Sequence, residues 1–524
     1  MSITNLPLEL LTHICEDLGP KDWGAFRTTC RQIHDNTLEA YTTRYFKKIT
    51  LLLTCEGLDR LEQIATSKTL CSSVEEIWII PNLLEPWAQL DKATFTKVDP
   101  ARHLLKWQRL PTTEESNKMK VELEALFAVF NTAMKEHNKI LQYSGLFNRL
   151  EKCLPHLKNA VNLGLRSYTT HFLLNRASHT DFTCLGLREL KNQFKYQDFP
   201  SLNRTMPYMP YGLAFSQLLN AMIKSSQKVQ ALHTCSHVYC GMKLGHLQLS
   251  EAQHQQLLPL LQDLTTLHMC IRLKDHEQEF FDEGTFNRLL KILFTVSSTL
   301  KTLTFAQWSP IEELSPLYFK DLAQKVQFSQ LEELNLHSIE VTVDSLEEFL
   351  RTAAPTLKRL SIRLVSLVDR ITSAPDLGPL TGNSQSWVTS LSTEVKTEMQ
   401  GLWRRVFKFL ADHLKLQYVE IYKLGYRGRL ILLKDALFME RGQPGAKPSP
   451  GLNPSDFYFD SEKASVIFKE WVTQLQIEMW HWAAFGGPKL PGTSNVRQVR
   501  PGFGNIASSV CVYPQQNQYA RLQI

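Results

Sequence analysis

The chain has 524 residues, more than the roughly 100 to 200 usual for one domain, so it holds several domains or one extended repeat array. Hydrophobic residues make up 43% and charged residues 21%, which is ordinary globular usage and excludes a disordered or fibrous chain. The net charge of +6 comes from 58 basic and 52 acidic residues, an imbalance too small to favour a nucleic-acid partner.

The first residues carry no recognisable targeting signal. Met1 to Asn5 contain no basic region, and no long apolar stretch follows, so we expect no secretory signal. No stretch approaches the roughly 18 apolar residues that cross a membrane. Ten cysteines are scattered singly, as in Ile14-Cys15, a pattern typical of reduced thiols. We therefore expect a cytoplasmic or nuclear protein with no membrane partner.

The chain opens with a predicted amphipathic helix. Thr4 or Asn5 can cap it, and Pro7 fits its first turn, where a missing N–H costs nothing. Four apolar residues then fall at helical spacings on one predicted face: Leu10, Leu11, Ile14 and Leu18.

Two further short helices are predicted behind it. Gly19-Pro20 ends the first helix, and Lys21-Asp22 starts a second through Trp23. A third helix would point Phe26, Thr29, Cys30 and Ile33 toward the interior. Its Arg27 and Arg31 would point outward. Three short helices bury little area, so we expect this module to lean on a neighbour or a partner.

These residues resemble a known motif. The run Leu6-Pro7-Leu8-Glu9-Leu10, with Ile14, Leu18, Asp22, Arg27 and Cys30-Arg31, is similar to an F-box, which docks on the Skp-type adaptor of cullin-based ubiquitin ligases. The resemblance covers about residues 3 to 48 of the chain. It implies that the adaptor-facing and internal apolar surface is supplied by Leu6, Pro7, Leu8, Leu10, Ile14 and Leu18.

Two neighbouring positions depart from the F-box pattern. Trp23 stands where the family more often has Leu, and the helix-weakening Gly24 follows it. If the F-box assignment fails, we expect it to fail at this second helix. The alternative is that the first helix only caps the following domain.

An apolar repeat occupies most of the remaining chain. The leucine-rich-repeat template L-x-x-L-x-L-x-x-N/C-x-L is matched in full by Val74 to Leu84, including Asn82. Later copies keep only its first half, and their anchors stand about 26 to 36 residues apart between Leu264 and Leu357. The predicted anchors are Val229 and Leu232; Leu264, Leu267 and Met269; Leu300, Leu303 and Phe305; Leu331, Leu334 and Leu336; Leu357, Leu360 and Ile362; and Leu416, Val419 and Ile421.

The later copies lack the asparagine of the template. Arg272, Trp308, Ile339 and Val365 stand in its place, so another device must satisfy the turn backbone. The predicted fold class is α/β: a short N-terminal helical F-box followed by an irregular leucine-rich-repeat solenoid, with parallel strands alternating with helices. The alternative is another α/β or helical domain whose leucine pairs are ordinary amphipathic patterning.

We expect three parts along the chain. Residues 1–48 form the helical docking module, 49–440 the repeat solenoid, and 441–524 a linker, a tryptophan-containing helix and a loose tail. A helical insertion is predicted near 114–150. An exposed loop is predicted near 373–392, where Ser, Thr, Gly and Pro are frequent.

Candidate chemistry is sparse. His233, Cys235, His237, Cys240 and His246 are zinc-compatible residue types, but their spacing matches no usual zinc finger. The sequence also lacks the G-x-x-x-x-G-K phosphate loop. We expect no metal, no cofactor and no catalytic residues, hence no enzyme.

The F-box resemblance implies a substrate-receptor subunit of an SCF-type (Skp-cullin-F-box) ubiquitin ligase. Its partners would be a Skp-type adaptor, through it a cullin scaffold, and an unknown target protein bound by the repeats. Candidate target-binding residues are the variable strand positions Glu332, Glu333, Asn335, Lys358, Arg359, Ser361, Gln417 and Glu420. Two alternatives remain: a repeat scaffold not engaged with a ligase, and an enzyme with a divergent α/β fold.

Overall fold

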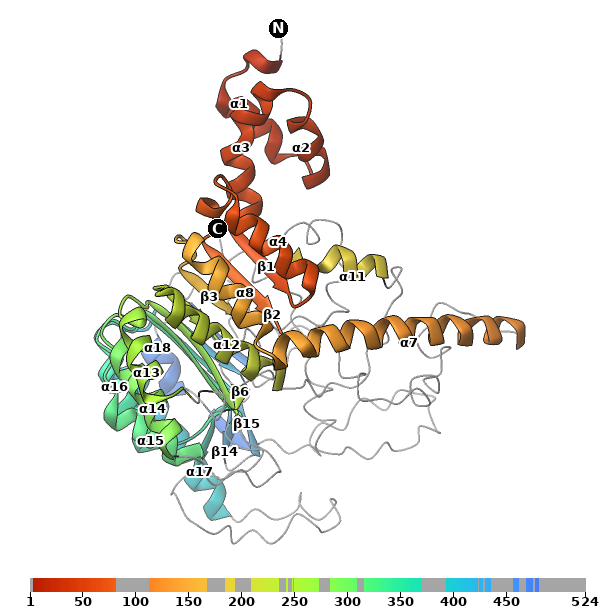
Figure 1. Ribbon diagram of the computed structural model, residues 1–524. Helices are drawn as coiled ribbons and strands as arrows, with labels where there is room; N and C mark the ends of the chain where they lie inside the picture. The colour runs from red at the N-terminus through yellow and green to blue at the C-terminus, as the bar shows by residue number, and fades with distance from the viewer. Residues whose placement is uncertain are drawn as a thin grey trace, which may run out of the picture.

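The computed structural model joins three N-terminal helices to a large, mainly parallel β-sheet (Figure 1). The residues described are 3–81, 113–166, 184–193, 209–234, 242–243, 247, 249–272, 283–308, 315–368, 393–422, 424–426, 429–434, 456–460, 468–474 and 476–479. The predicted loop at 373–392 and most of the predicted tail lie outside them. Among the described helices, none is long and apolar enough to cross a membrane.

The N-terminal helices are α1 (Leu8–Glu16), α2 (Pro20–Arg27) and α3 (Arg31–Phe46). Helix α1 begins after Pro7, because a 3-10 turn occupies Ile3–Asn5, so the predicted cap at Thr4 or Asn5 is wrong. Helix α3 is capped by Cys30, whose Sγ accepts a hydrogen bond from the Ile33 amide at 3.5 Å. Lys47 alone separates α3 from the first strand, so the helices join the sheet without a linker.

The strands of the main sheet follow one another in chain order, except that β4 lies beside β1. Within the described residues it has 12 strands in the order β16-β13-β11-β9-β8-β7-β5-β3-β2-β1-β4, with β6 beside β7. All pairs are parallel except β13 with β16. The strands are β1 (Lys48–Leu52), β2 (Glu76–Ile80), β3 (Asn162–Leu165), β4 (Cys184–Leu185), β5 (Ala231–His233), β6 (Met242–Lys243), β7 (Thr266–Arg272), β8 (Thr302–Trp308), β9 (Glu333–His337), β11 (Arg359–Arg363), β13 (Tyr418–Tyr422) and β16 (Asp456–Asp460).

Strand register brings the predicted anchors into a continuous apolar row. Leu303 stands beside Leu334, and Leu334 beside Leu360. The full row is Ile49, Ile77, Leu163, Leu232, Leu267, Leu303, Leu334, Leu360 and Val419. Every member of this row is buried. The strands predicted at these anchors are confirmed, whereas β3 was not predicted.

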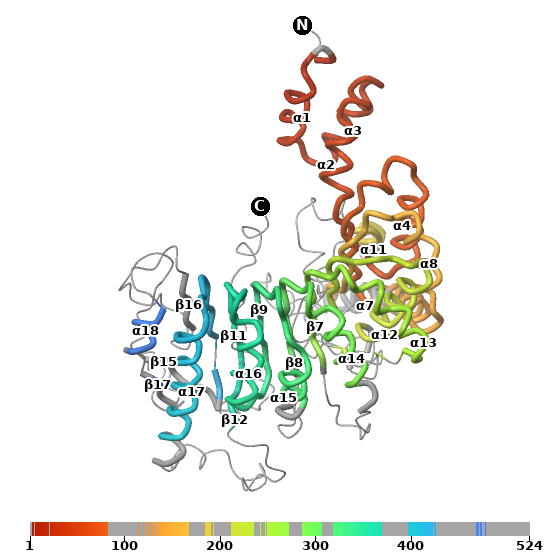
Figure 2. Tube along the Cα trace, turned by 90° about the vertical axis from the view of Figure 1, so that its left-hand side faces the viewer, coloured from red at the N-terminus to blue at the C-terminus, as the bar shows by residue number. Residues whose placement is uncertain are grey.

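Helices cover one face of this sheet. Figure 2 shows α14 to α17 side by side along the strands, and neighbouring helices contact each other. The helices are α4 (Cys55–Thr66), α7 (Thr113–Gln142), α8 (Gly145–Cys153), α11 (Leu187–Gln193), α12 (Met209–Ser225), α13 (Glu251–Leu257), α14 (Glu283–Val296), α15 (Ser315–Lys325), α16 (Val343–Ala353), α17 (Thr393–His413) and α18 (Phe468–Gln474). The predicted insertion is thus two helices, α7 and α8, separated at Ser144, which has a φ of 57°.

Left-handed residues replace the missing asparagines. Ser338 and Leu364 both have a φ of 53° and stand just before Ile339 and Val365. The Ser338 amide donates to the carbonyl of Arg363 at 2.8 Å, and the Leu364 amide to that of Tyr422 at 2.7 Å. The turns of successive strands are therefore joined by backbone hydrogen bonds rather than by side chains.

A second sheet of five described strands follows these turns. It comprises β10 (Glu340–Thr342), β12 (Ser366–Val368), β14 (Gly425–Tyr426), β15 (Arg429–Lys434) and β17 (Gln476–Met479). Strands β10, β12 and β14 run parallel to one another. Strand β15 pairs antiparallel with β14 on one side and with β17 on the other. The region predicted as linker, helix and tail therefore supplies a strand to each sheet, β16 and β17, which the sequence did not predict.

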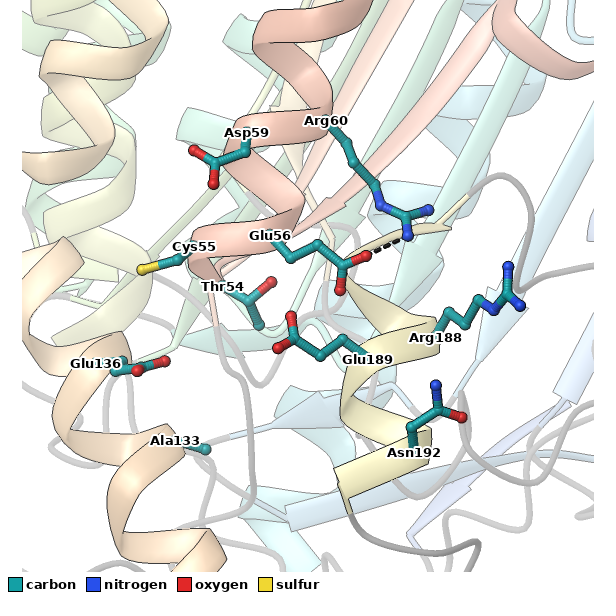
Figure 3. Close-up of a pocket in the computed structure, with 10 residues that line it drawn as sticks. All are labelled: Thr54, Cys55, Glu56, Asp59, Arg60, Ala133, Glu136, Arg188, Glu189 and Asn192. Carbon is teal, nitrogen blue, oxygen red and sulfur yellow. Dashed lines mark ion pairs between the residues drawn. The ribbon is translucent and has the colours of Figure 1, made fainter.

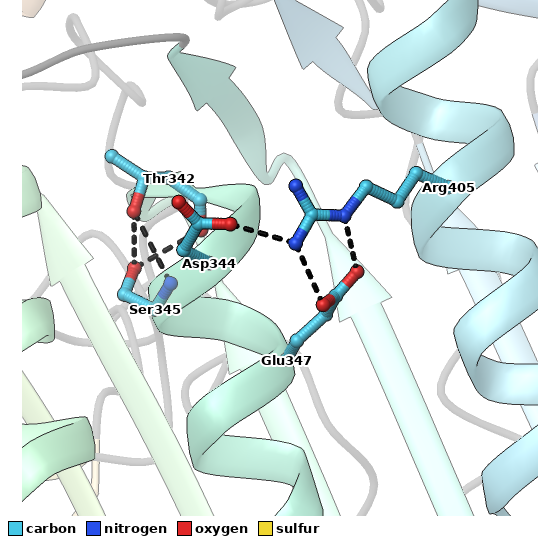
Figure 4. Close-up of polar contacts among 5 residues, drawn as sticks. All are labelled: Thr342, Asp344, Ser345, Glu347 and Arg405. Atoms are coloured by element: carbon cyan, nitrogen blue, oxygen red, sulfur yellow. Dashed lines mark hydrogen bonds and ion pairs between the residues drawn. The ribbon is translucent and has the colours of Figure 1, made fainter.

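Polar contacts join two of the covering helices (Figure 4). Arg405 of α17 donates to Glu347 of α16 at 2.8 and 2.9 Å and to Asp344 at 2.7 Å. Thr342 caps α16 by accepting from the Ser345 amide at 3.2 Å. Because Arg405 is half-exposed, these pairs orient the helices more than they stabilise them.

The apolar row predicts the outcome of a stability experiment. Leu334 is 0% exposed at the centre of the row, so Leu334→Ala should lower the free energy of unfolding by about 2–5 kcal/mol. Glu332→Ala, two residues away on the surface, should change it by less than about 1 kcal/mol. Urea denaturation followed by circular dichroism measures both; equal losses would contradict the role assigned to the row.

Candidate functional site

An exposed apolar surface lies on the N-terminal helices. Ile3 is 42% exposed, Leu8 and Leu10 are each 50% exposed, and Ile14 is 38% exposed. Pro7 is also exposed, while Leu6 and Leu18 are half-buried. Large apolar side chains in water mark a contact surface when they gather in one place.

Helix α1 is apolar on two sides. Leu11 and Cys15 face the interior and are fully buried, whereas Leu10 and Ile14 remain exposed. The prediction that Leu10, Leu11, Ile14 and Leu18 share one face is therefore wrong. The helix can hold the module together and still present leucines outward.

Trp23 is the centre of the module's small core. It is 1% exposed, and its ring centroid lies 5.6 Å from that of Tyr41 and 5.5 Å from that of Tyr45, both in edge-on geometry. Cys15 completes this cluster. The expectation that Trp23 and Gly24 weaken the second helix is wrong, because α2 forms and Trp23 fills the space among the three helices.

Two arginines pack on these aromatic rings. Arg27 is only 9% exposed, with its Cζ 4.1 Å from the Tyr41 ring centroid and its Nη2 donating to Nε2 of His34 at 3.0 Å. Burial lowers the pKa of Arg27 and raises that of Tyr41. Arg27 was predicted to point outward; it points inward because α2, not α3, contains it. Arg44 donates to the Glu16 carbonyl at 2.8 Å and lies over Trp23.

The charged candidate target-binding residues pair across neighbouring strands and form a charge ladder. Glu333, Arg359 and Glu420 alternate with the apolar row and so lie on the opposite face of the sheet, whereas Glu332, Lys358 and Gln417 directly precede their strands. Lys358 binds Glu332 at 2.8 Å, Arg359 binds Glu333 at 3.8 Å, and Arg363 binds Glu420 at 2.6 Å. The Lys358 hydrogen bond lowers the pKa of Glu332. Gln417 is exposed, and Asn335 donates to the Thr304 hydroxyl at 3.2 Å.

Two of these candidates are not surface residues. Ser361 is 5% and Glu420 7% exposed, and the Ser361 hydroxyl donates to Glu420 at 3.1 Å. Arg363, which sequence reasoning missed, closes this network with two bonds of 2.6 and 2.7 Å to the same carboxylate. The sequence could have indicated Arg363, because side chains alternate along a strand and Arg363 is the next residue on the same face after Ser361.

A second cluster lies on the same face nearer the N-terminal helices, and sequence reasoning missed it as well. Register places Trp78, Gly164, His233 and His268 on four adjacent strands. The Trp78 and His233 ring centroids are 4.6 Å apart, and those of His233 and His268 are 5.9 Å apart. Gly164 permits this contact, because a Cβ there would stand 2.6 Å from Cβ of His233. Arg166 lies over Trp78, its Cζ 4.5 Å from the ring centroid.

Both imidazoles of this cluster are neutral near pH 7. Burial, followed by the positive charges of His268, Arg166 and Lys48, lowers the pKa of His233 to about 3. Burial lowers the pKa of His268 to about 4.

A cavity of about 610 Å³ opens between α4, α7 and α11 (Figure 3). Four carboxylates, Glu56, Asp59, Glu136 and Glu189, line it together with Arg60 and Arg188, and Glu56 pairs with Arg60. Partial burial and the carboxylates Glu136, Asp59 and Glu189 raise the pKa of the Cys55 thiol in its wall. A thiol that stays protonated is a poor nucleophile.

Among the described residues, no group of three or more His, Cys, Asp or Glu side chains is arranged to hold a metal ion. Cys235, His237, Cys240 and His246 lie outside the described residues.

The three helices thus form a compact module, with an aromatic core and with Leu8 and Leu10 exposed on α1. Comparison with protein families identifies it. The F-box domain matches residues 3–35, which contain α1, α2 and the start of α3, so these residues form an F-box domain. No curated protein matches the chain.

Gly24 gives a test of the module's packing. A Cβ there would meet nothing within 4 Å, so Gly24→Ala should stabilise α2 by about 0.5–1 kcal/mol through helix propensity. Gly57→Ala in α4 is the matched control, because its Cβ would stand 2.5 Å from the Leu52 carbonyl oxygen, and it should cost about 1–3 kcal/mol. Thermal melting measures both. Destabilisation by Gly24→Ala would mean that α2 is packed more tightly than described.

The imidazole cluster predicts sensitivity to acid. Above pH 6.5, His233 and His268 are neutral in both folded and unfolded chains; as the pH falls below 6.5, the unfolded chain takes up protons first. Folding stability should therefore fall by about 1–2 kcal/mol per imidazole between pH 7 and pH 5. A His233→Gln/His268→Gln variant should lose part of this pH dependence in urea denaturation. His13→Gln, on the surface of α1, should keep all of it.

Proposed function

We propose that the chain is a substrate-receptor subunit of an SCF-type ubiquitin ligase, with the F-box helices bound to a Skp-type adaptor and through it to a cullin. The observation that carries the proposal is the set of exposed apolar side chains on a helix of an F-box domain. Leu8, Leu10 and Ile14 would be desolvated by the adaptor, which compensates for the small core of the module.

The region after the F-box is proposed to be a degenerate leucine-rich-repeat solenoid that binds the target protein. Its support is the apolar row across successive parallel strands, the helices on one face, and the backbone bonds that join the turns at Ser338 and Leu364. The target would lie on the face that none of the described helices covers. In this proposal the chain binds its partners without catalysing a reaction, so it is not an enzyme. It would act in the cytoplasm or nucleus.

The connection between the two parts fits such a role. Phe46, at the end of α3, packs against both the aromatic core of the F-box and the apolar core of the sheet. Only Lys47 separates α3 from β1. A short, packed connection holds a bound target at a defined distance from the adaptor, which raises its effective concentration near the ligase.

Adaptor capture tests this proposal. Leu10→Ser/Ile14→Ser should reduce co-purification of a Skp-type adaptor at least about tenfold, because the contact loses two apolar side chains while the core residues Leu11 and Cys15 stay in place. Phe294→Ser, which removes a 67% exposed side chain on α14, is the matched control and should leave capture unchanged.

The variants should melt at the same temperature as the parent chain. Failure of the parent chain to bind the adaptor, when folded, would instead favour a repeat scaffold that is not engaged with a ligase.

A further inference from the structure

The cavity between α4, α7 and α11 lies at the carboxyl ends of two parallel strands. Strand β1 leads through the Thr54 cap into α4, and β4 leads through Gly186 into α11. Here β4 lies beside β1, although β2 and β3 separate them along the chain. Open parallel α/β sheets bind ligands outside the carboxyl ends of strands, where the strand order changes direction.

The wall of this cavity is built by close contacts between distant parts of the chain. Gly186 has a φ of 85°, and a Cβ on it would meet Thr54 and Gly57, so only a glycine lets the two turns touch. Helix α7 is fixed beside them, because the buried His137 donates from Nδ1 to the carbonyl of Leu53 at 3.1 Å. The cavity is therefore a fixed feature of the fold.

The lining of the cavity is negatively charged. Its four carboxylates outnumber its two guanidinium groups, which leaves two net negative charges. Asp59 binds Arg149, which lies outside the lining and also binds Glu62, so this group leaves the balance unchanged. Glu136 makes no hydrogen bond or ion pair among the described residues. A cation in the cavity would compensate for this charge.

An acceptor atom in the wall also lacks a partner. Oε1 of Glu56 pairs with Arg60, but Oε2 is buried and has no hydrogen-bond partner among the described residues. Buried acceptors normally have a donor. Figure 3 shows Glu56 and Glu189 projecting between α4 and α11, with Glu136 on α7 at the left of the cavity. A ligand with several N–H groups would complete this arrangement.

The placing of the carboxylates favours an organic cation over a metal ion. Within the described part of the chain, no three acidic, histidine or cysteine side chains are arranged to share one metal ion. A guanidinium carries five N–H donors in a planar fork, so it can bind carboxylates that stand on different helices. The volume of about 610 Å³ falls in the roughly 300–1,000 Å³ range of ligand sites, which is ample for an arginine side chain.

We propose that this cavity is a second protein-binding site, in which Glu136 and Glu56 bind an arginine side chain from a basic segment of a partner protein. The site lies apart from the open sheet face and goes beyond the proposed substrate-receptor function. Glu136 would accept the charged hydrogen bonds, and Glu56 would add its second oxygen. Two net negative charges suit a segment with more than one basic residue.

Binding of defined peptides to the full chain tests the proposal. The probes are three fluorescein-labelled peptides, Gly-Ser-X-X-X-Ser-Gly, in which X is arginine, lysine or citrulline, followed by fluorescence anisotropy at about 0.15 M salt. Citrulline keeps the shape of arginine without its charge. The arginine peptide should bind at least about tenfold more tightly than the citrulline peptide. It should bind about threefold more tightly than the lysine peptide, because an ammonium lacks the planar fork.

Variants locate the bound arginine. Glu136→Gln should weaken binding of the arginine peptide about tenfold, and Glu136→Asp about threefold, since the charge remains on a shorter side chain. Glu114→Gln is the matched control, because it removes the same charge from an exposed side chain at the other end of α7, outside the cavity lining. It should change the affinity less than about twofold. All three variants should melt with the parent chain, since Glu136 and Glu114 are exposed.

Equal binding of the arginine and citrulline peptides, including no binding of either, would overturn the assignment. So would a loss in Glu114→Gln as large as that in Glu136→Gln. Displacement of the labelled peptide by spermidine at or below the concentration of unlabelled arginine peptide needed would show that a diffusible polyamine is the ligand, and would also reject the proposal. Adaptor capture by the same preparations reports on the F-box separately, so a failed peptide test leaves the substrate-receptor proposal standing.

Discussion

The parallel register of the main sheet is the constraint on which the rest of the structure depends. Register sets Leu303, Leu334 and Leu360 side by side, although 26 or more residues separate them along the chain. Because side chains alternate, the same register puts Thr304, Asn335 and Ser361 together on the opposite face. A slip by one residue would exchange the two sets. The apolar core and the composition of the open face are therefore fixed together.

The F-box is stabilised differently from the sheet, because three short helices offer little apolar area to bury. Its core is built on Trp23 with two tyrosines, and Arg27 and Arg44 lie over the rings. Cations on aromatic faces add attraction where leucines are few. This arrangement leaves Leu8 and Leu10 of α1 exposed, where they can serve a contact. Phe46 then connects that core to the sheet, so the module is supported by its neighbour, as its size requires.

Periodicity in the sequence predicted the strands whose anchors repeat, because burial on a parallel sheet demands the same spacing in each copy. It missed β3, where Leu163 and Leu165 keep the template spacing but Ala160 replaces its first large apolar residue. It failed for Arg27 because the boundary between the second and third helices was set too early. Periodicity also could not show that Glu420 is buried. Alternation predicts on which face of the sheet a side chain lies, but not which side chains of other strands surround it there. The contacts that decide these positions are all between distant parts of the chain.

The open face of the sheet has two parts, the charge ladder and the imidazole cluster, whose polar side chains are arranged differently. In the ladder, Glu333 and Glu420 are each paired with an arginine of β11, and Glu332 is paired with Lys358 just before β11. A ligand binding there must compete with these pairs, and releasing the buried Glu420 carboxylate would leave a charge without compensation. In the cluster nearer the F-box, strand β3 contributes Gly164 in place of a side chain, so the rings of Trp78 and His233 from the strands on either side come into contact. Strand β1 directly follows α3, which sets this cluster at the end of the sheet that carries the F-box (Figure 2).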